Sequence, residues 1–176
     1  MMYAWWRGDP LPRVPAVEGF HVERTSGGPL HDALSGLDAV EIQTRLDRGH
    51  RLFVARLDGS VVAWGWSATR EASIGELGIT FSIPPGNRYL WDFVTLPVWR
   101  GRGFYPLLLR AIMSGEADAE HFWIGHDHEN VASARGVLKA GFSPVCAVGL
   151  SPTGLRFYPV GRPDRVQALT GLLGGA

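Results

Sequence analysis

The sequence has a single cysteine, no excess of charge and no long apolar run, and each shortage excludes a class of protein. Cys146, alone among 176 residues, cannot form an intramolecular disulfide, and one thiol fits a reducing compartment. Basic and acidic side chains number 17 each, so composition does not favour nucleic acid or an anionic membrane surface as partner. No run approaches the ~20 apolar residues that cross a bilayer, and residues 1–6 lack the pattern of a signal peptide. We therefore expect a cytoplasmic protein that binds neither nucleic acid nor membrane.

The chain is long enough for one domain with a sizeable core, since 45% of its residues are hydrophobic. We expect a single domain over residues 1–176, with residues 1–17 as an N-terminal arm. This arm has no clear periodicity, yet Tyr3, Trp5 and Trp6 need apolar cover. The arm therefore lies either against its own domain or in a homodimer contact.

Hydrophobic periodicity predicts alternating groups of strands and helices. Strands are expected at residues 20–25, 51–57, 60–68, 75–83, 90–96, 122–124, 145–150 and 155–160. Helices are expected at residues 30–37, 40–48, 105–119, 130–140 and 163–173. Asp58 and Gly59 form a two-residue turn of the type I′ kind, which predicts a hairpin. The strands before residue 96 should form an antiparallel meander.

The most informative stretch covers residues 90–110, which read as a strand, a basic glycine loop and a helix. The loop is Arg100-Gly101-Arg102-Gly103. Glycines let a backbone turn tightly against a ligand, and a helix N-terminus presents free N–H groups and the positive end of its dipole. The combination predicts a cradle for a phosphate or pyrophosphate. The alternative is an ordinary strand-to-helix turn with solvated arginines.

This loop resembles the acyl-CoA loop of the GNAT N-acetyltransferase superfamily, in which Arg/Gln-x-x-Gly-x-Gly/Ala leads into a helix. The six positions here are Arg100, Gly101, Arg102, Gly103, Phe104 and Tyr105. The last position departs from the small residue of the family, and the following Pro106 has no N–H to offer a phosphate.

A second stretch, residues 130–142, has both a structural and a functional interpretation. Asn130 can cap a helix with its side-chain oxygen, and Gly141 can end that helix in the left-handed conformation. The same residues read Asn-x-x-Ser-x-x-x-Val-x-Lys-x-Gly-Phe. This pattern resembles the second GNAT signature, Asn-x-x-Ala-x-x-x-Tyr-x-x-x-Gly-Phe.

The resemblance implies an α/β (α+β) GNAT fold, a mixed and mostly antiparallel sheet flanked by helices. It implies acetyl-CoA as acyl donor, no metal, and direct attack by a primary amine of a small molecule or protein in a ternary complex. The resemblance implies that the backbone of Phe93, Val94 and Thr95 binds the cofactor and that Asn130 contacts the CoA arm. The residues implied to hold the pyrophosphate are Arg100, Gly101, Arg102, Gly103, Phe104 and Tyr105. A non-catalytic acyl-CoA-binding or sensor domain of the same fold is the alternative function.

The catalytic residues are less clear, because two familiar positions differ. Where many GNAT proteins have a tyrosine that protonates the leaving thiolate this chain has Val137, and where some have a glutamate it has Gly125. An amine must lose a proton before it attacks a thioester, so a base or a water chain is needed. The nearest candidates are His126, Asp127 and His128, and the two histidines point the same way if the strand before them continues; Asp92 is the other candidate.

Each of these candidates also has a structural interpretation. Asp127 and its neighbours can form a helix-entry loop, and Asp92, in an apolar strand, can pair with an arginine. Tyr89 and Glu76 are weaker alternatives on neighbouring strands. The histidines at 121, 126 and 128 lack the spacing of a metal site, and Cys146 reads as a buried strand thiol rather than a nucleophile.

Overall fold

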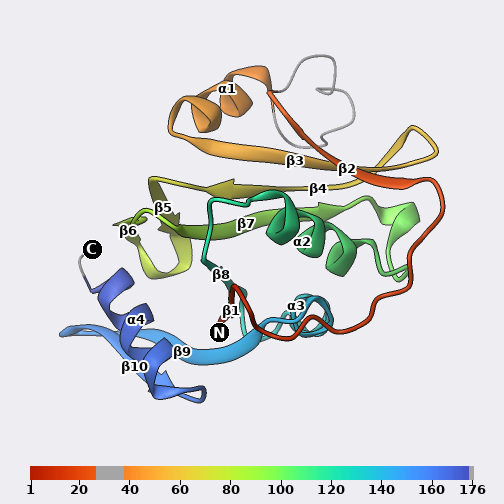
Figure 1. Cartoon of the computed structure of the whole chain (residues 1–176). Helices are drawn as coiled ribbons and strands as arrows, with labels where there is room; N and C mark the ends of the chain where they lie inside the picture. The colour runs from red at the N-terminus through yellow and green to blue at the C-terminus, as the bar shows by residue number, and fades with distance from the viewer. Residues whose placement is uncertain (27–37, 175–176) are drawn as a thin grey trace.

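An eight-stranded sheet with helices on both faces forms the framework of the protein (Figure 1). The structure is a computed structural model and describes residues 1–26 and 38–174. The main-sheet strands, in spatial order, are β10 (Gly154–Pro159), β9 (Ser143–Ser151), β1 (Met2–Trp6), β8 (His121–Gly125), β7 (Asn87–Thr95), β4 (Ser60–Ala68), β3 (His50–Leu57) and β2 (Phe20–Thr25). The strands β5 (Glu71–Ile74) and β6 (Ile79–Ser82) form a separate two-stranded sheet. The helices are α1 (Ala39–Asp47), α2 (Phe104–Gly115), α3 (Val131–Ala140) and α4 (Pro163–Leu173), and the 3₁₀ turns are η1 (Gly75–Leu77) and η2 (Pro97–Trp99).

The predicted fold class is confirmed, because the main sheet is mixed and mostly antiparallel. Among its described strand pairs, β7 and β8 run parallel and the others are antiparallel. The β7–β8 connection passes through α2, as parallel strands require a crossover. In this crossover the glycine loop lies between η2 and α2.

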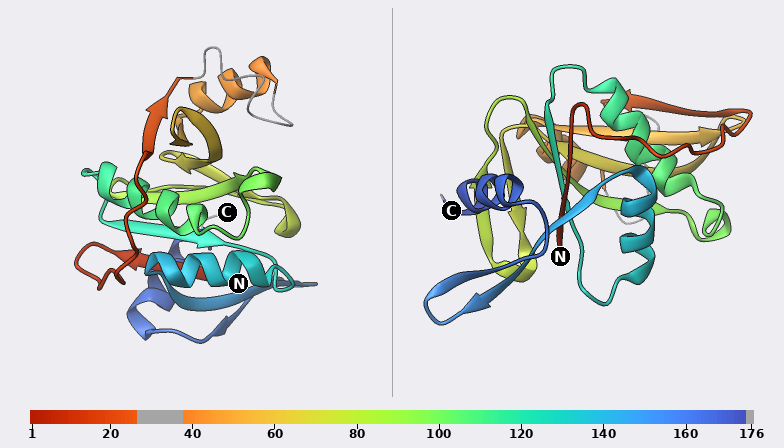
Figure 2. Two further views of the ribbon diagram at one scale, coloured as in Figure 1. Left: turned by 90° about the vertical axis from the view of Figure 1, so that its right-hand side faces the viewer. Right: turned by 60° about the horizontal axis from the view of Figure 1, so that its bottom comes forward.

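Alternation along the strands divides the core between the two faces of the sheet. Phe53 and Ala55 pack in the cluster that contains α2 and α3, whereas Leu52 and Val54 pack against Ile42 of α1. On that second face, α4 and the β5–β6 hairpin cover the strands β1, β8 and β9. Figure 2 shows α4 beside the β9–β10 hairpin at one end of the molecule.

The prediction of an N-terminal arm was wrong for its first residues. Residues Met2–Trp6 form strand β1, which pairs with β8 on one side and β9 on the other. Tyr3 and Trp5 are buried in the cluster below α2, so they find their apolar cover within their own domain. A strand covered on both faces shows a continuous apolar run rather than alternation, which explains the missing periodicity.

Several local predictions are confirmed. Asp58 and Gly59 both have positive φ, 48° and 82°, as a type I′ turn between β3 and β4 requires. The helix predicted at residues 163–173 matches α4, and that predicted at 40–48 overlaps α1. The helix predicted at residues 30–37 lies outside the described residues.

Two boundaries differ from prediction. The strand expected at residues 75–83 is interrupted, because Gly75–Leu77 form η1 and Gly78 ends this turn in the left-handed conformation. Its β6 portion pairs with β5 rather than with the main sheet. Helix α2 ends at Gly115 rather than at Ala119, so that the carboxylate of Glu116 turns inward.

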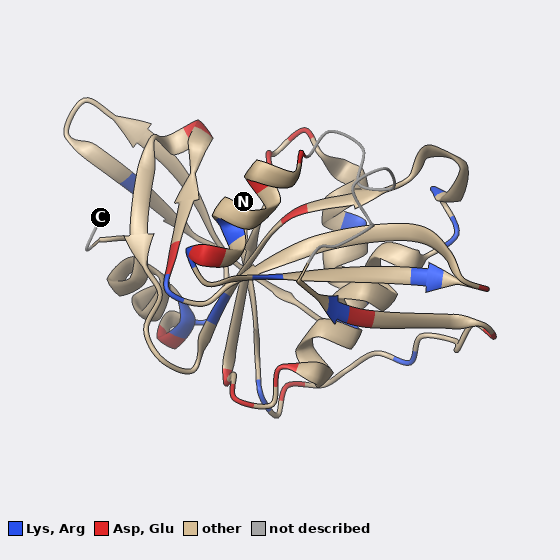
Figure 3. Ribbon diagram, turned by 90° about the horizontal axis from the view of Figure 1, so that it is seen from above, with Lys and Arg blue, Asp and Glu red and all other residues tan. Residues whose placement is uncertain are grey.

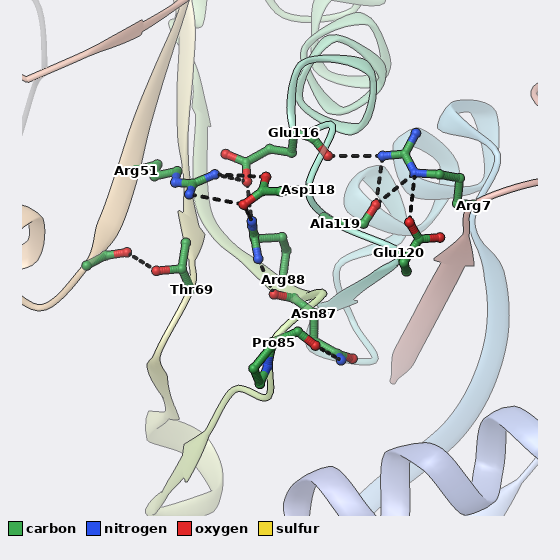
Figure 4. Close-up of polar contacts among 11 residues, drawn as sticks. Arg7, Arg51, Thr69, Pro85, Asn87, Arg88, Glu116, Asp118, Ala119 and Glu120 are labelled. Atoms are coloured by element: carbon green, nitrogen blue, oxygen red, sulfur yellow. Dashed lines mark hydrogen bonds and ion pairs between the residues drawn. The ribbon is translucent and has the colours of Figure 1, made fainter.

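Glu116 is part of a buried ion network that joins the ends of β3, β7 and α2 (Figure 4). Its Oε2 accepts from Arg88 Nε and Arg51 Nη1, and Arg88 Nη2 also contacts Asp118. Nearby, Arg7 donates to the carbonyl of Ala119 (2.9 Å). Elsewhere, charges of both signs are interspersed over the ribbon (Figure 3). No helix in the described ranges is long and apolar enough to cross a membrane.

Candidate active site

Strands β7 and β8 separate halfway along β7. Their parallel ladder runs from Asn87↔His121 to Leu90↔Ile124, and β8 ends at Gly125. Beyond Leu90, β7 continues to Thr95 and is paired with β4 alone within the described sheet. An unpaired strand edge carries N–H and C=O groups that an extended ligand can use. The backbone of Phe93, Val94 and Thr95, for which the resemblance implies cofactor binding, lies on this stretch.

Two cavities open at the separation, one toward each face of the sheet. The cavity on the α2 and α3 face, called the loop cavity below, has a volume of about 820 Å³. The cavity on the α1 face, called the α1 cavity, has a volume of about 840 Å³ and is lined by Arg45 and the β5–β6 hairpin. Residues that line both cavities are Glu76, Trp91, Asp92, Gly125, His126 and Asp127. We call these six residues the junction, because there the two cavities meet through the sheet.

The glycine loop forms the end of the loop cavity. Gly101 and Gly103 have φ of 76° and 83°, which strongly favours glycine, and a Cβ at either position would meet no atom within 4 Å. Gly103 is the N-cap of α2, and no side chain caps this helix. The first N–H groups of α2 are therefore available to an anion, as at other helix N-termini.

The two loop arginines differ in position. Arg100 lines the loop cavity, and its Nε donates to the carbonyl of Thr95 at 3.1 Å. Arg102 instead lies with its guanidinium carbon 4.8 Å from the Trp99 ring centroid and does not line the cavity. Of the loop residues predicted to bind cofactor, Arg102 is thus the one that the structure places outside the cavity wall.

Helix α3 forms the opposite wall of the loop cavity. Asn130 caps it, accepting from the Ser133 backbone N–H at 2.9 Å, and Gly141 ends it with φ 109°. Sequence reasoning missed the wall residues Arg135 and Lys139, which lie four positions apart on one helix face. That spacing of two basic residues was the available signal.

Tyr105 closes the space between α2 and α3. Its hydroxyl lies 3.3 Å from Ser133 Oγ, and a Cβ at Gly136 would come within 2.3 Å of its ring. Burial raises the pKa of Tyr105 to about 12, so the phenol stays protonated at neutral pH. The neighbouring Val137 is fully buried in the core.

Asp92 lies at an interruption of the β4–β7 ladder. Trp64 pairs with Val94 and Trp66 pairs with Trp91, so Gly65 alone opposes both Asp92 and Phe93. Asp92 has φ 50°, and its carboxylate contacts Arg45 Nη1. The arginine partner that the sequence allowed for Asp92 is thus Arg45. The Asp92 side chain is also 31% exposed, which its apolar strand did not indicate.

Strand β8 ends at Gly125, so the strand that would make the two candidate histidines point the same way does not continue to them, although both line the α1 cavity. His126 stacks on Tyr3, and its Nδ1 lies 2.6 Å from the Asp127 carbonyl. Since a carbonyl only accepts, Nδ1 carries a proton, and in the neutral imidazole the Nε2 lone pair would accept from the Tyr3 hydroxyl, 3.1 Å away. His128 lines the α1 cavity but has an 89% exposed side chain, and Glu129 is its ionic neighbour.

Of the three junction carboxylates, that of Asp92 is paired with Arg45. The carboxylates of Glu76, on η1, and of Asp127 have no ion pair within residues 1–26 and 38–174. Burial, with a further contribution from Glu76, raises the pKa of Tyr89, which also lines the α1 cavity. The described residues bring no three of His, Cys, Asp and Glu together as a metal site.

Solved structures that are similar to this chain include several acetyltransferases. No protein-family model matches the sequence, and no curated protein matches it either. A GCN5-related N-acetyltransferase from Kribbella flavida matches with a TM-score of 0.52 and 18% identity over 93% of this chain; the match spans 59% of that protein. An IAA acetyltransferase from Bacillus cereus has a TM-score of 0.53 and 17% identity, covering 76% of this chain and 82% of that one. The aminoglycoside acetyltransferase AAC(6')-Ib, solved with coenzyme A and kanamycin, has a TM-score of 0.52 and 14% identity, covering 85% and 98%.

These likenesses show that the chain has the GNAT fold. In this chain the fold consists of the mixed sheet and the four helices described above. At such low identity the likeness extends to the fold and not to a substrate.

Proposed function

We propose that this protein transfers an acetyl group from acetyl-CoA to a primary amine of a small molecule. The observation that carries the proposal is the open edge of β7, which leads from a glycine loop at a helix N-terminus to a junction with a second cavity. One cavity then accommodates the donor and the other the acceptor. Direct transfer requires such a meeting point of two substrates.

The loop cavity fits coenzyme A in three respects. Phe93, Val94 and Thr95 offer backbone groups to the pantetheine amides as an added strand would. The loop from Arg100 to Tyr105 offers N–H groups and open space for a pyrophosphate. Asn130, Arg135 and Lys139 border the same cavity and suit the remaining polar groups. When bound, acetyl-CoA supplies an acetyl group activated as a thioester.

The α1 cavity suits an amine acceptor. Three carboxylates line it, those of Glu76, Asp92 and Asp127, and Arg45 is already paired with one of them. Its volume of about 840 Å³ lies within the range of small-molecule sites. An ammonium group would therefore be attracted to the junction and held in a confined space.

Glu76 is the group we assign to the proton that leaves the amine. It faces both cavities, and its oxygens have no cationic partner in the described chain. His126 can take the proton only after the Tyr3 hydroxyl releases its Nε2. His128 lies at the exposed mouth and offers a weaker position.

Calorimetry and thiol release together test the function. We expect binding of acetyl-CoA and CoA by calorimetry, and release of the CoA thiol with at least one member of a panel of small amines. Binding without release for any amine would favour the alternative, an acyl-CoA-binding or sensor domain. No binding of either CoA species would contradict both functions.

A matched pair of glycine variants tests the cofactor loop within the same experiment. Gly101→Ala forces an alanine to φ 76° in the loop, and Gly59→Ala imposes φ 82° on the β3–β4 turn, away from both cavities. Both should lose similar stability, because the backbone strain is alike. Only Gly101→Ala should weaken CoA binding, by about tenfold. Equal CoA affinities would place the phosphates elsewhere.

A further inference from the structure

We infer that Asp92 serves transfer as a positioning residue, which Arg45 clamps into a β-bulge at the junction, and not as the proton acceptor. This inference rests on the proposed function. It concerns how the backbone of β7 is held where the donor and acceptor cavities meet.

The first observation is the backbone of Asp92. Within the described residues, Asp58 and Asp92 are the non-glycine residues with positive φ, at 48° and 50°. Asp58 is explained by its type I′ turn, whereas Asp92 lies inside strand β7. A left-handed residue inside a strand is strained and persists only where its surroundings hold it there.

The second observation is that one side chain holds two consecutive residues of β7. The guanidinium carbon of Arg45 lies 4.5 Å from the Trp91 ring centroid, and Arg45 Nη1 contacts the Asp92 carboxylate. Consecutive residues of a regular strand point to opposite faces, so one partner could not reach both. The bulge at Asp92 brings both side chains to the α1 face.

The third observation is that Arg45 is itself fixed. Its Nε donates to Glu41 at 2.7 Å, one turn earlier in α1, and its guanidinium also lies 5.1 Å from the Trp66 ring centroid. Its side chain is only 14% exposed. Trp66 pairs with Trp91 across the β4–β7 ladder, so α1, β4 and β7 meet at this one side chain. Held from three elements, Arg45 keeps the bulge in one conformation.

The bulge matters because of its place. It follows Leu90, where the β7–β8 ladder stops, and it precedes the open edge at Val94 and Thr95. On the other side, Phe93 covers Gly65, where a Cβ would come within 2.1 Å of the ring. The backbone of Asp92 and Phe93 therefore leaves both ladders at the junction, and its orientation there depends on the clamp.

Four variants separate a clamp from a proton acceptor. Asparagine tolerates positive φ, and its side-chain oxygen can still accept a hydrogen bond from Arg45. Glycine tolerates positive φ but has no side chain for Arg45 to contact, and alanine neither tolerates positive φ nor accepts a hydrogen bond. We expect kcat to fall least in Asp92→Asn, more in Asp92→Gly, and by more than about tenfold in Asp92→Ala and Arg45→Met. The KM for acetyl-CoA should rise by a smaller factor than kcat falls, because Val94 and Thr95 lie beyond the bulge and remain paired with β4. The acidic limb of the kcat pH profile should persist in all four.

Two controls accompany these variants. Asp58→Ala removes an aspartate of the same φ in the β3–β4 turn, so it should cost similar stability and leave kcat unchanged. Glu41→Gln removes one partner of Arg45 and leaves the pair with Asp92 intact, so its effect should be smaller than that of Arg45→Met.

The inference is overturned if Asp92→Asn, Asp92→Gly and Asp92→Ala lose kcat equally and lose the acidic limb. That pattern would make the Asp92 carboxylate the proton acceptor. The other titratable groups that line the α1 cavity are Glu76, Tyr89, His126, Asp127 and His128; burial raises the pKa of Tyr89, so Tyr89 is excluded as the source of an acidic limb. Should no amine be acetylated, backbone amide spectra still decide: Arg45→Met must shift the Asp92 and Phe93 resonances, and unchanged resonances would disprove the clamp independently of function.

Discussion

The stability of the site framework should depend strongly on one buried carboxylate, Glu116. Its side chain is 1% exposed, and its Oε2 accepts from both Arg88 and Arg51 (Figure 4). Arg88 is 4% exposed and is the second residue of β7, in the part of the strand that precedes the junction. The variant Glu116→Gln leaves the shape almost unchanged and removes the negative charge between two guanidinium groups.

The expected loss is large because the remaining charges stay buried. Breaking a buried ion pair by removing one partner costs about 3–5 kcal/mol. With a urea dependence of about 1–3 kcal/mol per molar, the unfolding midpoint should fall by about 1–5 M. At about 2–4 °C per kcal/mol for a chain of this size, the melting temperature should fall by about 6–20 °C.

Urea unfolding followed by tryptophan fluorescence and circular dichroism measures this loss. Asp118→Asn is the control, because Asp118 contacts the same arginines with a side chain that is 62% exposed, and it should lose at most about 1 kcal/mol. The double variant Arg88→Met with Glu116→Leu should be more stable than Glu116→Gln, since no unpaired charge remains between those positions. A Glu116→Gln protein within about 1 kcal/mol of the wild type would refute this reasoning.

Three further predictions concern the site itself. Gly65→Ala should lose about 1–3 kcal/mol of unfolding free energy and weaken CoA binding, since the new methyl group displaces Phe93. The control is Gly149→Ala, in β9, where a Cβ would meet no atom within 4 Å. Equal losses of unfolding free energy in the two variants would contradict the close contact between Gly65 and Phe93. Burial, with smaller contributions from Arg45 and Arg48, lowers the pKa of His50 from 6.5 to about 4. As pH drops from 6.5 toward 4, His50 is therefore protonated in the unfolded chain before it is protonated in the folded chain, and the free energy of unfolding falls. His50→Gln should reduce this fall in urea titrations while still accepting from Trp91, which donates to His50 Nδ1 at 3.0 Å; an unaltered pH dependence would assign the fall to other groups. Glu76→Gln should lower kcat and remove the acidic limb of the kcat pH profile, with little change in CoA affinity. If Glu76→Gln keeps the acidic limb, or if Asp127→Asn removes it instead, Glu76 is not the proton acceptor.

Local chemistry made much of the fold predictable. Asp58 and Gly59 determine a hairpin by their tolerance of positive φ, and Asn130 and Gly141 mark the two ends of α3. In each case the signal and the structure lie within a few residues. The glycine loop was found for the same reason, because Gly101 and Gly103 lie next to the helix that they precede.

Non-local pairing was not predictable in this way. Strand β1 lies between β8 and β9, more than a hundred residues away in sequence, and its five residues show no alternation because both faces are covered. Likewise, the sequence indicated that Asp92 needs a partner, but Arg45 lies 47 positions earlier on a helix. The end of the β7–β8 ladder at Leu90 also leaves no mark on composition, so Glu76 could not be placed at the junction beforehand.

The candidate site arises where the sheet fails to continue. The β7–β8 ladder stops at Leu90, the β4–β7 ladder breaks opposite Gly65, and η1 interrupts what would otherwise be a strand. Each interruption frees backbone groups or moves a side chain to an unexpected face, and all three meet at the junction. Backbone groups freed inside a protein must find other partners. Along β7, an extended ligand can supply the hydrogen-bond partners that β8 does not provide. The same interruption of the sheet needs Arg45 to hold the backbone, and under the proposed function it is where the two substrates meet.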